Sequence, residues 1–216
     1  MLFRVVSFSI LVSSLLSILC CGTVIWDAGH GSPDGGASGK YGTLEKDLTL
    51  KLALSAQEIA LFLGIPSRLT RNSDESIYSH DAKTIRQKKV SDLQNRLSIA
   101  ADTPHPIFVS IHTNAAAETI SGLQVFYAPS ESSDRLSMVM TAWFSRYLPK
   151  QRIRQPVKAP DHVYLTKNLR CPAVIVEYGF ITNPQEEQLL SDPTYQFRLA
   201  FLSLCGICQY INEKGA

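Results

Sequence analysis

The sequence predicts a single α/β domain of three layers (α/β/α), in which helices cover both faces of a mostly parallel central sheet. Its 216 residues, 45% of them hydrophobic, suffice for one sizeable core. Short apolar runs rich in branched residues alternate with longer segments whose apolar residues recur at helical spacing. No repeat or long linker interrupts residues 23–216. Strands that alternate with helices are typical of parallel sheets that are buried on both faces.

The predicted elements follow one another along the whole chain. Strands are expected where apolar runs are bounded by loop residues, at residues 23–26, 107–111, 123–127 and 173–176. Helices are expected where the apolar period lengthens, at residues 44–63, 91–101, 133–147, 184–190 and 195–210.

The first of these helices carries the clearest signals. Its apolar side chains recur on one face from Leu48 to Leu63. Thr43 is the candidate N-terminal cap, and Gly64 is the expected stop.

The first 22 residues differ in composition from the rest of the chain. Arg4 is their only charge, and residues 5–19 form an apolar run broken only by serines. This pattern is typical of an export signal, although the run is also close to the roughly 20 residues of a membrane-spanning helix. We therefore expect an exported protein with a signal peptide or N-terminal membrane anchor at residues 1–22, followed by one domain at residues 23–216. A buried core helix at the N-terminus is the alternative.

Charge and cysteine content exclude several classes of partner and scaffold. The net charge of +2 comes from 21 basic and 19 acidic residues spread along the chain, so no nucleic-acid partner is expected, and membrane contact only through the N-terminal segment. Beyond that segment the cysteines are Cys171, Cys205 and Cys208, an odd number that does not indicate a disulfide framework. The spacing of Cys205 and Cys208 would suit redox or metal chemistry, but their helical context favours two small core residues.

Chemically active side chains follow several of the predicted strands. His30 comes shortly after the first strand, and His112 and Glu177 directly continue two others. Glu45 begins the first long helix, and the glycine-rich residues 31–42 allow the chain to fold it back toward His30. Ligands gather beyond the carboxyl ends of parallel strands. Two imidazoles and one carboxylate form a recurrent catalytic zinc set, which leaves Glu177 as the base.

Each of these residues also has a structural interpretation. A single histidine at a strand end is more often a hydrogen-bonded structural residue, and Glu45 in a first helical turn could simply favour the helix dipole. Glu177 is harder to explain in this way, because a carboxylate that continues an apolar strand is expected at a site or in a buried pair. Their convergence favours a metal site.

Other catalytic patterns fit less well. Ser38-Gly39-Lys40 is similar to part of a phosphate-binding loop, but that loop needs glycine where this sequence has Asp34, and serine or threonine where it has Tyr41. No Gly-x-Ser-x-Gly elbow is present either, and Cys171 has no evident partner histidine.

Five motifs in order resemble the zinc-dependent N-acetylmuramoyl-L-alanine amidases of the type-3 family, at residues 27–37, 45–47, 69–74, 110–115 and 176–184. The resemblance spans nearly all of residues 23–210. It implies one zinc ion (Zn2+) per chain and assigns the site residues as follows. The metal ligands would be His30, Glu45 and His112, and Glu177 would be the catalytic carboxylate. Arg96 and Asn114 would support the ligands or contact the substrate.

The resemblance also implies a substrate. It predicts hydrolysis of the amide bond between N-acetylmuramic acid and L-alanine, so that the partners are the glycan strands and stem peptides of peptidoglycan, with a protein activator possible. Residues 91–93, 122–127, 189–190 and 195–196 are most similar to the germination-specific amidases of the spore cortex, where this cut is the first step toward muramic-δ-lactam. The alternatives are a zinc peptidase or aminoacylase that acts on another substrate, and a non-catalytic wall-binding module.

Overall fold

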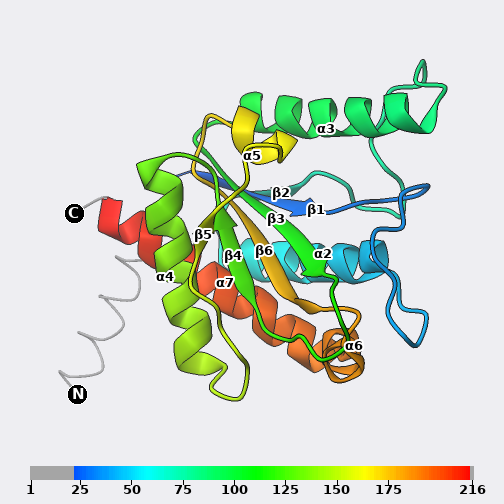
Figure 1. The fold of residues 1–216 in the computed structure, drawn as a ribbon. Helices are drawn as coiled ribbons and strands as arrows, with labels where there is room; N and C mark the ends of the chain where they lie inside the picture. Colours follow the sequence, from blue (N-terminus) through cyan, green and yellow to red (C-terminus); the bar gives the residue numbers. More distant parts are fainter. Residues whose placement is uncertain (1–21, 215–216) are drawn as a thin grey trace.

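The computed structural model describes residues 22–214 (Figure 1). The predicted signal or anchor at residues 1–22 therefore lies outside the described residues, except for Gly22. Among the helices of the described part, none is both long and apolar enough to cross a membrane.

A six-stranded sheet forms the middle layer, in the order β2-β1-β3-β6-β4-β5. Its strands are β1 (Thr23–Ala28), β2 (Ser67–Leu69), β3 (Pro106–Asn114), β4 (Gln124–Tyr127), β5 (Val157–Lys158) and β6 (Ala173–Phe180). All neighbouring strands run parallel except β4 and β6, which are antiparallel. The predicted α/β class with a mostly parallel sheet is confirmed.

Helices cover both faces of this sheet (Figure 1). They are α2 (Glu45–Phe62), α3 (Ile85–Ala101), α4 (Glu131–Tyr147), α5 (Tyr164–Asn168), α6 (Pro184–Ser191) and α7 (Pro193–Lys214). The helices α2, α4 and α7 pack on one face, and α3 and the short α5 pack together on the other. The helix α6 follows β6 at the carboxyl end of the sheet.

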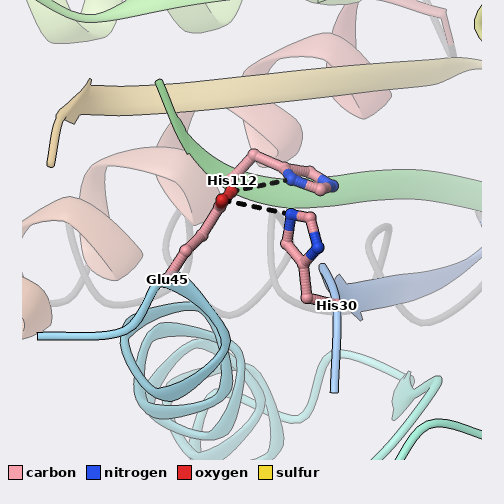
Figure 2. A group of neighbouring side chains, drawn as sticks. All are labelled: His30, Glu45 and His112. Atoms are coloured by element: carbon pink, nitrogen blue, oxygen red, sulfur yellow. Dashed lines mark hydrogen bonds and ion pairs between the residues drawn. The ribbon is translucent and has the colours of Figure 1, made fainter. Parts of the chain in front are cut away.

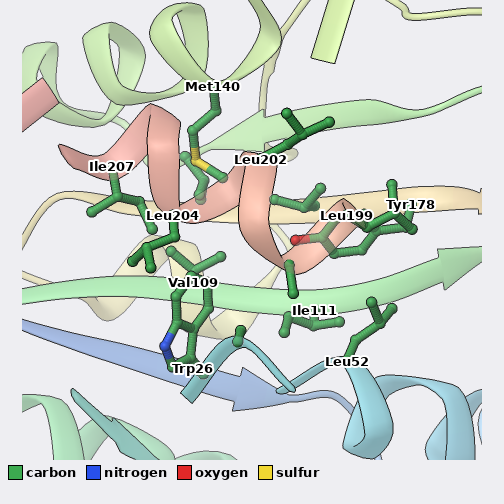
Figure 3. Close-up of a cluster of buried hydrophobic side chains, with 14 of the residues drawn as sticks. Trp26, Leu52, Val109, Ile111, Met140, Tyr178, Leu199, Leu202, Leu204 and Ile207 are labelled. Atoms are coloured by element: carbon green, nitrogen blue, oxygen red, sulfur yellow. The ribbon is translucent and has the colours of Figure 1, made fainter. Parts of the chain in front are cut away.

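The larger hydrophobic core lies between the sheet and α2, α4 and α7. There Trp26 and Val109 of the sheet meet α7 residues such as Leu204 and Ile207, all of them buried (Figure 3). Because successive strand residues point to opposite faces, Ile25 and its neighbours face α3 and α5 in a second, smaller cluster. Beyond this smaller cluster, the same face carries polar side chains toward the carboxyl ends of the strands.

The starts of α2 and α3 need the main corrections to the sequence prediction, and α4 and α7 begin at Glu131 and Pro193, slightly before their predicted starts. The N-cap of α2 is Leu44 and makes no side-chain cap bond, so Thr43 is not the cap. The backbone of Thr43 is instead tied to Gly39 and Glu187. The helix α3 begins at Ile85 instead of residue 91, and its first turn is closed by a capping box of Thr84 and Gln87. Its opening turns are mostly polar, and their apolar residues Ile85 and Val90 are exposed, so no buried apolar period marks the start of the helix. Gly64 does end α2, with φ of 72°.

The structure supports the interpretation of Cys208 as a core residue but leaves Cys205 outside both hydrophobic clusters. Cys171, Cys205 and Cys208 are free thiols of intermediate exposure. Cys205 and Cys208 lie on α7, and Cys208 packs against the larger core.

Candidate metal centre

Three elements bring His30, Glu45 and His112 together, as Figure 2 shows. His30 lies just after β1, His112 lies near the end of β3, and Glu45 is the first residue of α2. Glu45 Oε2 lies 3.1 Å from His30 Nε2, and Glu45 Oε1 lies 3.0 Å from His112 Nδ1. One donor atom from each side chain lies within 4.8 Å of the others. A group this compact, with two imidazoles and a carboxylate, is chemically suited to a zinc ion.

The backbone fixes the Glu45 carboxylate in this position. Glu45 is 4% exposed, and its two oxygens accept hydrogen bonds from the N–H groups of Ala37, at 2.8 Å, and Thr113, at 3.0 Å. Burial acts to raise the pKa of Glu45, but His112 and His30 outweigh it, so the pKa lies below its ordinary value. The carboxylate is therefore ionised and ready to bind a cation.

Glycine lets the backbone approach these side chains closely. A Cβ atom on Gly29 would lie 2.4 Å from His112 Cε1, and one on Gly36 would lie 2.6 Å from Glu45 Oε2. Gly36 also has a φ of 67°, which side chains rarely allow. The glycine-rich loop thus folds Glu45 against His30, as its composition predicts.

Glu177 lies beside the group, on the strand next to His112. Glu177 of β6 and His112 of β3 are register partners, so their side chains share one face of the sheet. Glu177 Oε2 is buried and has no hydrogen-bond partner among the described residues. Burial, partly offset by His112 and reinforced by Glu45, raises the pKa of Glu177 to about 7. A buried, partnerless carboxyl oxygen at the carboxyl end of a strand is typical of a reactive site.

A pocket of about 310 Å³ opens over this group. Its floor is the sheet, with Asp27, Ser110 and Glu177 among the lining residues, and its walls come from α3 and α5. The helix α5 was not predicted from the sequence, because its five residues are too few to show a helical period.

Arg96 lies in the part of the pocket wall that α3 forms, and its guanidinium contacts other residues of the protein. It contacts Asp27 at 2.5 Å and Asp92 at 2.7 Å, and donates to the carbonyl of His30 at 2.8 Å. Asn114 is not among the described residues that line the pocket, and its Oδ1 accepts from the N–H of Ala115. The structure thus brings Arg96 to the site and leaves Asn114 outside the pocket.

Two further residues hold the loops around the site and were not identified from the sequence. Arg71 is buried and donates to the backbone oxygens of Ala28 and Gly29, next to His30. Glu187 of α6 accepts hydrogen bonds from backbone N–H groups of the loop before α2. Arg71 belongs to the motif at residues 69–74, which was the available signal, whereas Glu187 is a glutamate in a polar helical turn without any distinguishing pattern.

Comparison with known proteins gives consistent matches over nearly all of the described residues. Residues 24–209 match the family model described as N-acetylmuramoyl-L-alanine amidase. The germination-specific N-acetylmuramoyl-L-alanine amidase of Bacillus subtilis is 32% identical over 202 residues, which cover 92% of this chain and 84% of that protein.

Solved structures agree with these sequence matches. The CwlD amidase of Clostridioides difficile, solved in complex with the GerS lipoprotein, superposes with a TM-score of 0.83 at 37% identity, covering 88% of this chain and 98% of that one. The amidase AmiC2 of Nostoc punctiforme gives a TM-score of 0.76 at 28% identity, covering 88% of this chain and 97% of that one.

Proposed function

This chain belongs to the N-acetylmuramoyl-L-alanine amidase family, and from that premise we propose that it is an exported zinc enzyme of spore-cortex formation. It hydrolyses the amide bond that joins N-acetylmuramic acid to L-alanine in peptidoglycan. The observation that carries the zinc assignment is the convergence of His30, Glu45 and His112 on one point.

The donor set supports zinc over other cations. Magnesium and calcium prefer oxygen ligands, whereas two imidazoles with one carboxylate suit zinc and leave a position open for chemistry. When bound, the ion supplies a Lewis acid that polarises the scissile carbonyl and lowers the pKa of water.

Residues of the chain transfer the proton, line the pocket and support the metal ligands. Glu177 has a buried oxygen that accepts no hydrogen bond from the described residues, and it accepts a proton from the attacking water and passes it to the departing nitrogen of L-alanine. Val163 and Leu165 of the α5 region form an apolar part of the pocket wall and limit the access of water. Arg96 holds the carbonyl of His30, and so acts as a support for the metal ligands.

Two similarities support the cortex role and an extracytoplasmic location. One relative is a germination-specific amidase of a Bacillus, and one structural neighbour was solved with a lipoprotein partner. We propose that this chain also acts on cell wall outside the cytoplasm and that a partner protein assists it. Muropeptide analysis of spores from a strain without this protein tests the cortex role. Loss of muramic-δ-lactam is expected, and its full retention would refute that role.

The zinc site and the base are tested with paired variants. Glu177→Gln should retain one zinc ion per chain and lose about 10²–10⁴-fold in turnover, because a general base contributes about that much. His30→Ala should lose both zinc and activity. Metal analysis is paired with an assay that counts new L-alanine N-termini released from purified peptidoglycan. N-acylated amino acids are assayed in parallel, because they are the substrates expected of the alternative function, an aminoacylase.

Glu58→Gln is the matched control, because Glu58 is exposed on α2 and its substitution changes the charge equally. It should leave zinc content and turnover unchanged. A Glu177→Gln protein without zinc, or a wild-type enzyme that remains active after thorough chelation, would contradict these assignments.

A further inference from the structure

The two ring nitrogens of His30 face different carboxylates. Nε2 lies 3.1 Å from Glu45 Oε2, and Nδ1 lies 3.2 Å from Asp34 Oδ2. Figure 2 shows one nitrogen of His30 turned to Glu45 and the other on the far side of the ring. His112 has no such arrangement, since its Nδ1 is the atom that faces Glu45. The Asp34 carboxylate therefore contacts only one of the two imidazoles, and does so from outside the group of three.

Asp34 is held in place by its own loop. Its N–H donates to the oxygen of Gly31 at 2.8 Å, and the N–H of Gly31 donates back to the oxygen of Asp34 at 3.0 Å. Its second carboxylate oxygen, Oδ1, accepts from the N–H of Gly36 at 3.2 Å. Lys89 of α3 lies 3.5 Å from Oδ2 and balances its charge. These contacts leave Oδ2 directed at His30.

We propose that Asp34 is the positioning residue for His30: it accepts the Nδ1 proton and so leaves the Nε2 lone pair free for the metal. This inference rests on the proposed zinc site. A neutral imidazole carries its proton on one nitrogen only, and the hydrogen bond made by that nitrogen selects the other one as the ligand. A carboxylate behind a ligating histidine also orients the ring and makes it a stronger base.

The backbone of His30 makes this support necessary. His30 has a φ of 61°, a left-handed conformation that non-glycine residues rarely adopt. Its side chain is 20% exposed at the rim of the pocket, so packing alone does not fix the ring. With Asp34 absent, we expect the ring to sample both tautomers and more than one orientation.

Another carboxylate of this loop region offers a matched control. Asp74 accepts from Ser32 Oγ at 3.0 Å and pairs with Lys46, so it also ties down the loop that follows His30. No contact joins it to His30 among the described residues. Asp74→Asn and Asp34→Asn therefore make the same change of charge in the same region, but only the second alters the imidazole contact.

The test measures zinc affinity by competition with a chromogenic chelator, for the wild type and for Asp34→Ala, Asp34→Asn and Asp74→Asn. Loss of such a support typically weakens metal binding about 10–100-fold, which is expected for Asp34→Ala. Asp34→Asn should also weaken binding, because a neutral amide is a poorer acceptor. Asp74→Asn should change the dissociation constant less than about threefold.

A second readout follows the proton directly. Nitrogen-15 correlation spectra of the zinc-loaded protein should show the His30 proton on Nδ1 in the wild type and in Asp74→Asn. Thermal unfolding of the metal-free variants shows whether each is folded, and Asp34→Asn replaces Asp34→Ala if the latter is not. Equal zinc affinities for the Asp34 and Asp74 variants, or a His30 proton on Nε2, would overturn the inference. A wild-type protein that binds no zinc would instead refute the proposed function.

Discussion

Arg96 is the residue whose loss should destabilise this domain most clearly. It is 2% exposed and contacts Asp27, which is fully buried, at 2.5 Å. Arg96→Met keeps much of the side-chain volume but removes the guanidinium. Of the donors to Asp27 in the described part of the chain, the hydroxyls of Thr70 and Ser110 then remain. Breaking a buried pair from one side costs about 3–5 kcal/mol. For a domain of this size, that corresponds to a fall of roughly 6–20 °C in Tm.

The pH dependence of this loss has a definite sign. Burial acts to raise the pKa of Asp27, but Arg96, Ser110 and Thr70 outweigh it, and the pKa lies below its ordinary value. In the wild type, Asp27 therefore contributes stability above the unfolded pKa of about 4, and this contribution is lost as the pH falls. Without Arg96, burial dominates and the folded pKa rises above the unfolded one. The ionised group then destabilises the fold, so the loss caused by Arg96→Met should be larger at pH 7.5 than at pH 4.5.

Urea unfolding of the metal-free protein measures both effects. Arg68→Met is the control, because Arg68 is exposed and donates one hydrogen bond, to Thr103. It should cost less than about 1 kcal/mol. The double variant Asp27→Asn/Arg96→Met tests the cause. If an unpaired buried charge is responsible, the second substitution restores part of the lost stability. Arg96→Met as mild as Arg68→Met, or a double variant less stable than Arg96→Met alone, would refute the reasoning.

Two further substitutions test how closely the backbone fits around the site. Gly29→Ala places a Cβ atom 2.4 Å from His112 Cε1, so zinc content should fall, whereas Gly35→Ala, with nothing within 4 Å, should leave it unchanged. Equal zinc content in the two variants, by metal analysis, would show that the ring can move at no cost. Glu187→Gln weakens the hydrogen bonds to the loop before α2 and should lower the free energy of unfolding by about 1–3 kcal/mol, against no change for Glu58→Gln. Urea titrations that superpose for these two glutamine variants would show that the hydrogen bonds of Glu187 to this loop do not stabilise the fold.

The fold was predictable where the hydrophobic pattern of an element is local and long enough to be recognised. The strands β1, β3 and β6 are apolar runs between loop residues, and a run of this kind identifies a buried strand without knowledge of its partners. The strands β2 and β5 have three and two residues and cannot show a period. The antiparallel direction of β4 could not be predicted from the sequence either, because it depends on how β4 pairs with β6, about 50 residues later in the chain.

The site was predictable for a different reason. The residue types His30, His112 and Glu177 are conspicuous after apolar strands, and parallel strands end at one edge of the sheet, so their meeting follows from topology. The residues that hold the loops around the site give a weaker signal in the sequence. Arg71 acts through backbone carbonyls, which every residue has, and Glu187 binds N–H groups 144 and 146 residues away. Only the folded chain shows which carbonyl or N–H such a side chain reaches.

The left-handed backbone of His30 explains why Arg96 and Arg71 bind the turn after β1. A left-handed residue other than glycine costs about 1–2 kcal/mol, so the turn after β1 would relax if nothing held it. Arg96 binds the carbonyl of His30, and Arg71 binds those of Ala28 and Gly29, so two buried cations fix successive peptide groups. Arg96 is a residue of α3 and Arg71 lies in the loop after β2, so both belong to elements other than those that carry the candidate metal ligands. The turn is therefore held by protein contacts that do not depend on an ion, which lowers the entropic cost of metal binding.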